Sequence, residues 1–408
     1  MEMNKTLAIF TKEKISIAVE IAISFLLTIL MFFFYQKMIL AGPTASDVSM
    51  HVDFAKELPK IFTLGLREFI STTKLSHITV YPIWHILFSL VHVIIRDEAA
   101  AGGLLNALLV TANYLVLCYV LRKEIKSSWE RTFAPLFALA LTFAGPITLK
   151  IVNEQYYLGQ FSYNLWHNPT TLAVKPLALY ITYRYILLTR ARDAEENIRL
   201  KEYVIIGLLL FLSAFAKPSF IQVFCPAVAI YCILYFVSNW KTGFMWGMKN
   251  AAMILPASLA IFAQNWLTGV KTGGVVISPF ETWDYWTKNR LGSFAVSFAF
   301  ILVTFMMLAS EIEKTEWLSF TGLLFLVGFM EYSLLSFTNS PWIGDLEWGF
   351  SLTIGPAMLG GIVTVINQKK SYLQKAFAGV ILLLQFAFGL IYWIKYFEIA
   401  SFWVESFV

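Results

Sequence analysis

The sequence is poor in charged residues and in cysteine. Only 14% of its 408 residues are charged and 58% are hydrophobic, whereas about 25% charged residues is usual for a soluble domain. This composition excludes a soluble globular enzyme, a disordered chain and a nucleic-acid-binding protein. The three cysteines, Cys118, Cys225 and Cys232, lie in apolar segments without CxxC or CxH spacing. We therefore expect small buried side chains there rather than redox or metal-binding groups.

Common catalytic and nucleotide-binding motifs are also missing. No Walker A, GxGxxG, HExxH or GxSxG sequence occurs, so nucleotide-driven transport and the common hydrolase mechanisms have no support. The apolar run from residue 15 to about residue 40 is longer than the apolar region of a signal peptide, which is about 7–15 residues. We expect it to be the first membrane span, and the chain to be a polytopic membrane protein.

Apolar runs predict an all-α fold with about eleven spans and a long first extracytoplasmic loop carrying juxtamembrane helices. A spanning helix needs about 20 mostly apolar residues. The expected spans are residues 15–40, 100–121, 132–149, 169–189, 203–217, 219–237, 251–267, 292–310, 317–338, 350–367 and 374–395. The apolar run 82–95 has only 14 residues, a length more typical of an interfacial helix.

The basic residues predict the orientation. If the N-terminus is cytoplasmic and 82–95 does not cross, the cytoplasmic stretches hold 17 Lys and Arg and the opposite loops hold 6, with loop 41–99 set aside. Because cytoplasmic loops are enriched in basic residues, we predict a cytoplasmic N-terminus and an outer C-terminus. The large loops 41–99, 150–168, 268–291 and 339–349 would then all lie outside.

The first outer loop holds the main catalytic candidates. Thr44-Ala-Ser-Asp47 is typical of a helix start, and Asp47 and His51 lie on one face because they are four residues apart. Asp47 is the candidate general base, with His51 orienting a substrate or sharing a proton. The alternative is that Asp47 only caps the helix. Asp53, which points about 120° away from His51, is a substrate-binding candidate.

Two further segments supply substrate-binding candidates. The first segment is the start of the interfacial helix, where Tyr81 directly precedes Pro82 and His85 follows in the first turn. The second outer loop contributes Glu154, His167 and Asn168. Sugars are bound by aromatic faces and by amide, carboxylate and imidazole groups. The alternative, an interfacial aromatic belt, explains the tyrosines and Trp166 of the second loop but not its polar residues.

Lys217 lies at the outer end of a span, where the basic-residue pattern would not place it. An anionic headgroup such as a lipid phosphate would account for this position, and snorkelling to the interface is the alternative. Lys175 and Arg184 are weaker candidates within a span. Arg290 belongs to a later loop rich in tryptophan, which either binds carbohydrate or anchors the span ends.

This arrangement resembles the GT-C superfamily of polytopic glycosyltransferases over residues 15–240. The resemblance is carried by Ser46-Asp-Val-Ser-Met-His51, Tyr81-Pro-Ile-Trp-His85, Leu121-Arg122-Lys123 and Ala216-Lys217-Pro218-Ser219. It implies a GT-C-like module at 1–240 and variable helices at 241–408. It also implies transfer of a sugar from a polyprenyl-phosphate donor to a glycan or lipid acceptor outside the cytoplasm. Asp47 would be the base, Lys217 the phosphate partner, and the anomeric configuration would invert.

The chain departs from that pattern in two respects. No paired Asp-Glu or Asp-x-Asp occurs at position 47, so Mg²⁺ or Mn²⁺ is an option that the sequence does not require. No soluble domain follows the spans, so loops and spans would recognise the acceptor. The expected partners are the lipid-linked donor, the acceptor and membrane lipids, and no nucleic acid. The outer loops lack an Asn-x-Ser/Thr sequon, which favours a bacterial plasma membrane.

Two other functions stay open at this point. A polymerase or ligase of lipid-linked glycans shares the substrate type, but it would usually rely on a long outer loop late in the chain, and the longest loop here is the first. A flippase or transporter predicts charged residues within spans and an internal repeat. Only Glu20, Lys175, Arg184 and Glu331 lie well inside spans, and no repeat is evident.

Overall fold

The computed structural model describes residues 2–65, 81–154, 156, 160–194, 198–268, 274–287, 289–337 and 346–405. Helices are by far the main secondary structure of the described chain, which confirms the predicted all-α class at this level. The described strands are β1 (Val275–Ile277) and β2 (Leu335–Phe337), which pair antiparallel with Val276 opposite Ser336.

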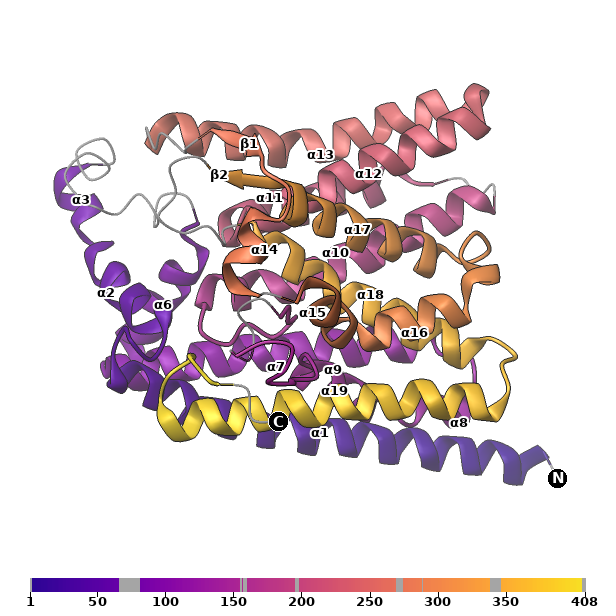
Figure 1. The fold of residues 1–408 in the computed structure, drawn as a ribbon, viewed down its shortest axis with the longest axis horizontal. Coiled ribbons are helices and arrows are strands. Elements are labelled where there is room, and N and C mark those ends of the chain that lie inside the picture. Colours follow the sequence, from indigo (N-terminus) through magenta and orange to yellow (C-terminus); the bar gives the residue numbers. More distant parts are fainter. Residues whose placement is uncertain are drawn as a thin grey trace.

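The longer helices run roughly side by side, and several of the shorter ones gather at one end of them (Figure 1). The longer helices are α1 (Glu2–Ala41), α7 (Glu98–Glu124), α10 (Pro169–Asp193), α11 (Leu200–Ala216), α12 (Ser219–Ser238), α13 (Trp240–Thr268), α17 (Glu316–Leu334), α18 (Glu347–Asn367) and α19 (Tyr372–Ile399). The shorter ones are α2 (Asp47–Glu57), α3 (Lys60–Leu64), α6 (Ile83–Ile95), α8 (Ser128–Arg131), α9 (Ala134–Phe143), α14 (Glu281–Trp286), α15 (Arg290–Ser297), α16 (Ala299–Met307) and the 3₁₀ turn Ala309–Glu311.

Six of the described helices are long and apolar enough to cross a membrane, or seven if the pair α15–α16, bent by 73°, is one span. The six are α1 from Glu13, α7, α12, α17, α18 and α19. Each of the eleven predicted spans overlaps a helix, but the one expected at 132–149 ends at Phe143. The reason is Pro146, which disfavours a helical conformation in the residue before it.

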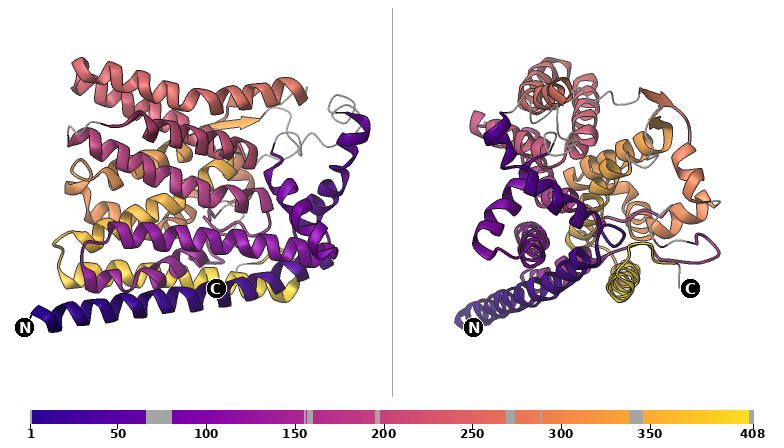
Figure 2. Two further views of the ribbon diagram at one scale, coloured as in Figure 1. Left: turned by 180° about the vertical axis from the view of Figure 1, so that it is seen from behind. Right: turned by 90° about the vertical axis from the view of Figure 1, so that its left-hand side faces the viewer.

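The helices differ sharply in burial. In α18, 94% of the apolar window is buried inside the protein, whereas in α1 the share is 17%. Accordingly, α1 lies along one edge of the bundle in both views of Figure 2. The edge helix still packs closely on α7, because a Cβ atom at Gly103 would lie only 3.0 Å from the Phe32 carbonyl oxygen. The core is therefore centred on α18, with α1 and α7 forming a tightly packed pair.

The two helices of the first predicted loop form as expected and pack on α7. Ser46 caps α2, since its hydroxyl oxygen accepts a hydrogen bond from the Val48 amide at 3.3 Å. The apolar stripe of α2, including Val48 and Val52, is buried. In α6, Trp84 is buried and donates through Nε1 to Asn106 Oδ1 of α7 at 3.0 Å. These contacts hold α2 and α6 together at one end of the bundle (Figure 1).

The opposite end is joined by a buried carboxylate. Glu124, at the end of α7, accepts from Arg190 Nη2 at 2.9 Å and from Trp317 Nε1 at 2.7 Å. Asn367, at the end of α18, donates to the Glu124 carbonyl at 2.7 Å. We call this the arginine end, and the end with α2, α6, the start of α10 and the start of α18 the loop end. The chain passes between the two ends repeatedly.

Glu124→Gln should lower the free energy of unfolding by about 2 kcal/mol, because the mutation replaces charge-assisted hydrogen bonds in a buried position with neutral ones. The matched control is Glu130→Gln, which removes the ion pair with Lys375 (3.0 Å) where both side chains are about a third exposed. That change should cost less than about 1 kcal/mol. Unfolding of the purified protein in detergent measures both. Equal losses would show that Glu124 does not join the helices.

Candidate functional site

The site begins with the segment that leads into α10. Asn164 donates through Nδ2 to the carbonyls of Leu141 (3.1 Å) and Ala144 (2.7 Å) at the end of α9. Its Oδ1 accepts from Lys175 Nζ at 3.0 Å, and that ammonium lies 4.2 Å from the centre of the Tyr163 ring. Lys175 is 2% exposed, so its described contacts give it a structural role. It holds in place the loop that presents His167 and Asn168.

Asn168 is the centre of the site. As the N-cap of α10, its Oδ1 accepts from the Thr171 amide at 3.0 Å and from the Thr170 hydroxyl at 2.8 Å. The same oxygen accepts from Lys217 Nζ at 3.1 Å. On the other side of the amide, Nδ2 donates to Asp47 Oδ2 at 3.1 Å. One amide side chain therefore contacts both a carboxylate and an ammonium group.

Lys217 reaches this amide from the end of α11. It is the C-cap of that helix, is 6% exposed, and precedes Pro218, where the chain turns into α12. Its ammonium also donates to Thr170 Oγ1 at 3.2 Å. The nitrogen lies 4.1 Å from the centre of the Trp348 ring and 5.9 Å from that of Tyr81, so two aromatic rings border the cation.

His167 is buried next to the same groups. Its carbonyl accepts from Ser46 Oγ at 2.9 Å, which attaches the loop to the start of α2. Its ring stacks on Phe402, with centroids 4.7 Å apart and an interplanar angle of 18°. Burial lowers the pKa of His167 below its usual range; the positive charge of Lys217 lowers it further, and Asp47 opposes this. The imidazole is therefore held neutral over a wider pH range than a free histidine.

His51 and His85 form a second buried group one turn along α2. His51 Nδ1 and His85 Nε2 are 2.9 Å apart, and the side chains are 3% and 0% exposed. A hydrogen bond between two ring nitrogens needs one N–H and one lone pair, so at least one of the rings is neutral. This contact joins α2 to α6 and thereby fixes the helix that carries Asp47.

Three predicted residues lie apart from this cluster. Asp53 is exposed and pairs with Lys56 at 3.2 Å, and Arg290 pairs with Asp284 at 2.7 Å. Glu154 is exposed. Within the described residues, no contact joins any of the three to Asp47 or Asn168. The structure thus brings together Asp47, Tyr81, His167, Asn168 and Lys217, with the pair His51–His85 behind them.

The sequence analysis overlooked three contributors to the site. Ser46 and Thr170 support Asp47 and Asn168, and both occur in helix-start patterns that signal a cap. Trp348 borders Lys217 from the start of α18, at the end of the expected outer loop 339–349. The rest of that loop, with Trp342 and Asp345, lies outside the described residues, as does the segment 66–80 between α3 and α6.

The charge and burial of the side chains determine what chemistry this site can supply. Asp47 is half-buried, so its carboxylate borders solvent, whereas the amide and ammonium groups beside it are buried. Among the described residues, no three His, Cys, Asp or Glu side chains gather as a metal site would require. A carboxylate can accept a proton, and a buried ammonium can stabilise an anion. The arrangement therefore offers a base and an anion-binding group side by side.

The chain matches no protein-family model and no curated protein. A functional assignment must therefore come from the geometry of Asp47, Asn168 and Lys217 and from the sequence patterns around them.

The thermal stability of the protein should fall as the pH drops below about 6.5, in part because of His167. The unfolded chain protonates this histidine near pH 6.5, whereas the folded protein keeps it neutral to lower pH. The unfolded state thus binds more protons in that window, and the folded state loses up to about 1.4 kcal/mol per pH unit. Thermal unfolding of the wild type and His167→Gln between pH 7.5 and 5 measures the difference. Identical pH dependence in the two proteins would contradict a depressed pKa at His167.

Proposed function

We propose that this protein is an integral membrane glycosyltransferase that moves a sugar from a polyprenyl-phosphate donor to a glycan or lipid acceptor outside the cytoplasm. The observation that carries the proposal is the Asn168 amide, which contacts Asp47 Oδ2 and Lys217 Nζ at 3.1 Å each. The amide thus holds a base and a cation near each other. Transfer from a sugar phosphate to a hydroxyl needs these two groups.

In the proposed reaction, the acceptor hydroxyl oxygen attacks the anomeric carbon while Asp47 takes the hydroxyl proton. The bond between the anomeric carbon and the phosphate oxygen breaks, and its electron pair leaves with the polyprenyl phosphate. Lys217 stabilises the negative charge that develops on that phosphate. A single displacement inverts the anomeric configuration. Because phosphate is a good leaving group, positioning and charge stabilisation suffice without a covalent enzyme intermediate.

The surroundings of the two groups favour a sugar. Tyr81 and Trp348 border the Lys217 ammonium, and aromatic faces pack against the C–H surfaces of a sugar ring. Asn168 fixes the distance between base and cation, because its Oδ1 is already held as the cap of α10. His51 and His85 act through α2: they position the helix that carries Asp47 rather than contact the sugar. This role differs from the sequence-based expectation, in which His51 orients a substrate or shares a proton and His85 binds the substrate.

We further propose that the chain crosses the membrane eleven times, with the arginine end cytoplasmic in a bacterial plasma membrane. Glu124, Arg190 and Asn367 meet at one end, and Ser46, Asn168 and Lys217 lie at the other. Alternation of the chain between these ends fits crossings by α1, α7, α9, α10, α11, α12, α13, α15–α16, α17, α18 and α19. The basic residues at the arginine end agree with the positive-inside rule.

Cysteines placed at Lys126 and at Glu154 should react with a membrane-impermeant maleimide from opposite sides of the membrane. Both positions are exposed in the structure, and an odd number of proposed crossings separates them. The three native cysteines are replaced by alanine in the background protein, which serves as the unlabelled control. In intact cells only the cysteine at position 154 should react. Labelling of both from outside, or of position 126 alone, would overturn the orientation.

Asp47→Asn should reduce turnover about 10²- to 10⁴-fold, the usual contribution of a general base, with donor binding largely retained. The matched control is Asp53→Asn on the same helix, which removes only an exposed ion pair and should leave turnover unchanged. The assay uses a strain that lacks the protein, with lipid-linked sugars and surface glycans followed by mass spectrometry. Wild type and Asp53→Asn should restore the glycan, whereas Asp47→Asn should leave lipid-linked sugar accumulated.

Two outcomes of that experiment contradict the proposal. If the strain lacking the protein shows unchanged lipid-linked sugars and unchanged glycans, the protein is not a glycosyltransferase of this kind. If the strain is deficient but Asp47→Asn keeps more than about a tenth of wild-type turnover, the loss is below even the low end expected for a general base. In that second case the glycosyltransferase activity is still supported, but Asp47 is not its general base and only lies at the start of α2.

Lys217→Met should weaken binding of the lipid-linked donor about tenfold or more, because a buried charge-assisted contact with phosphate is lost. The control is Lys150→Met, an exposed lysine in the loop after α9, which should leave donor binding unchanged. Binding is measured with purified protein whose thermal unfolding confirms that each variant is folded. An unchanged donor affinity in folded Lys217→Met would remove Lys217 from the phosphate-binding role.

A further inference from the structure

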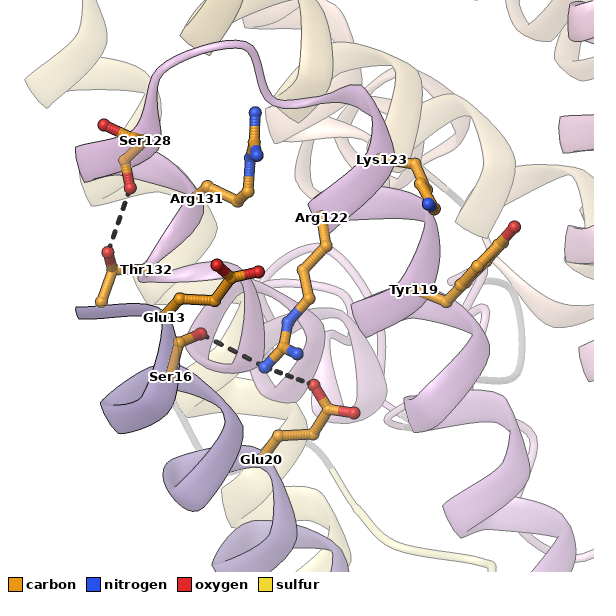
Figure 3. A pocket seen from close by; sticks show the side chains of 9 residues that line it. All are labelled: Glu13, Ser16, Glu20, Tyr119, Arg122, Lys123, Ser128, Arg131 and Thr132. Carbon is orange, nitrogen blue, oxygen red and sulfur yellow. Dashed lines mark hydrogen bonds and ion pairs between the residues drawn. The ribbon is translucent and has the colours of Figure 1, made fainter. Parts of the chain in front are cut away.

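A polar cavity lies at the arginine end, at the opposite end of the helices from the candidate site. It has a volume of about 400 Å³ and lies between the first turns of the apolar part of α1, the end of α7 and α8 (Figure 3). Charged and hydroxyl side chains dominate its lining, which consists of Glu13, Ser16, Glu20, Tyr119, Arg122, Lys123, Ser128, Arg131 and Thr132. The proposed glycosyl transfer uses none of these residues.

Part of the charge in this cavity is neutralised within the protein. Arg122 forms an ion pair with Glu20, with Nη2 2.6 Å from Oε2, and donates to Ser16 Oγ at 3.2 Å, as the dashed lines in Figure 3 show. These contacts join α7 to α1 and leave little of the Arg122 charge for a ligand. Its Nε is buried and has no hydrogen-bond partner in the described part of the chain. The remaining charges of the lining belong to Glu13, Lys123 and Arg131.

These remaining charges carry both signs. Arg131 is fixed at the rim, because it donates to the carbonyls of Ile125 at 3.0 Å and Lys126 at 3.2 Å. Lys123 is exposed, with its ammonium 5.9 Å from the centre of the Tyr119 ring. Glu13 is exposed, and no ion pair joins it to another described side chain. The cavity therefore presents two cationic groups and one carboxylate to a ligand.

The cavity lies where a lipid would meet the protein. The apolar part of α1 begins at Glu13, and only 17% of its apolar window is buried. On the adjoining face of the helix, Ile21 and Phe25 are 64% and 70% exposed. If α1 crosses the membrane as proposed above, this exposed apolar face contacts acyl chains and the cavity lies at the level of the headgroups.

We propose that this cavity binds the headgroup of a glycerophospholipid that carries a primary amine. Lys123 and Arg131 hold the phosphodiester, and Glu13 accepts hydrogen bonds from the ammonium group. The acyl chains lie along the exposed face of α1. Charge-assisted hydrogen bonds of both signs match the two charges of such a headgroup. A bound lipid of this kind joins α1, which lies at the edge of the bundle, to α7 and α8. Binding does not depend on glycosyl transfer.

The test is native mass spectrometry of the full-length protein in detergent, titrated separately with phosphatidylethanolamine and with phosphatidylglycerol. The wild type should retain phosphatidylethanolamine in preference to phosphatidylglycerol, which lacks the amine. Glu13→Gln should lower the affinity for phosphatidylethanolamine about tenfold, the order expected for one charge-assisted hydrogen bond, without lowering that for phosphatidylglycerol. Lys123→Met should lower both affinities. Lys249→Met, at an exposed position on α13, is the control and should change neither.

Two results would overturn the proposal. Equal retention of the two lipids by the wild type, unaffected by either variant, would mean that only non-specific boundary lipid is bound. Loss of both lipids in Lys123→Met with no effect of Glu13→Gln would define a phosphate site that does not recognise an amine. Thermal unfolding of each variant confirms that it is folded. Because this experiment measures no glycan, a failure of the lipid-binding proposal does not contradict the proposed transferase activity. A failure of the proposed transferase activity likewise does not contradict lipid binding.

Discussion

The arrangement of the loop end depends on the hydrogen bonds of a single amide side chain, that of Asn168. Its Oδ1 caps α10 and accepts from Lys217, and its Nδ2 donates to Asp47. An amide can do this because it carries both an acceptor and two donors. A carboxylate at this position would repel Asp47, and an ammonium would repel Lys217. Three segments more than forty residues apart in sequence are thereby joined at one group.

Much of the fold could be predicted because apolar length and helix caps are local signals. The eleven predicted spans all overlap helices, and α2 begins within the helix start expected at 44–47, with Ser46 rather than Asp47 as its cap. The predicted helix ends were less accurate where they depend on neighbouring turns. The helix α9 ends at Phe143 instead of residue 149, and α13 begins at Trp240 instead of residue 251. The turns of α13 before residue 251 carry Lys241 and Lys249, and a prediction based on apolar runs leaves such charged residues out of a span. The number of crossings and the division at residue 240 are tertiary properties and stay predictions.

The site could be predicted in part, for a physical reason. Asp47, His167, Asn168 and Lys217 all lie at helix ends, and helix ends on one side of a bundle come close together. Asp53, Glu154 and Arg290 were chosen by residue type, and their described contacts do not bring them into this cluster. Sequence periodicity indicates which face of a helix is buried but not which other helix that face meets. The contact between His51 and His85, which are 34 residues apart, therefore required the structure.

Acids and bases form direct ion pairs at both ends of the protein, but around Asn168 a neutral amide lies between a carboxylate and a lysine. At the arginine end, acids and bases contact each other directly, as Glu124 does with Arg190 and Glu20 does with Arg122. Direct pairing satisfies both charges and stabilises the packing of the helices, but it leaves neither group available to a substrate. At the loop end, the Asn168 amide lies between Asp47 and Lys217 and hydrogen-bonds to both. The neutral amide between Asp47 and Lys217 is the feature of this fold on which the proposed transfer of a phosphate-linked sugar rests.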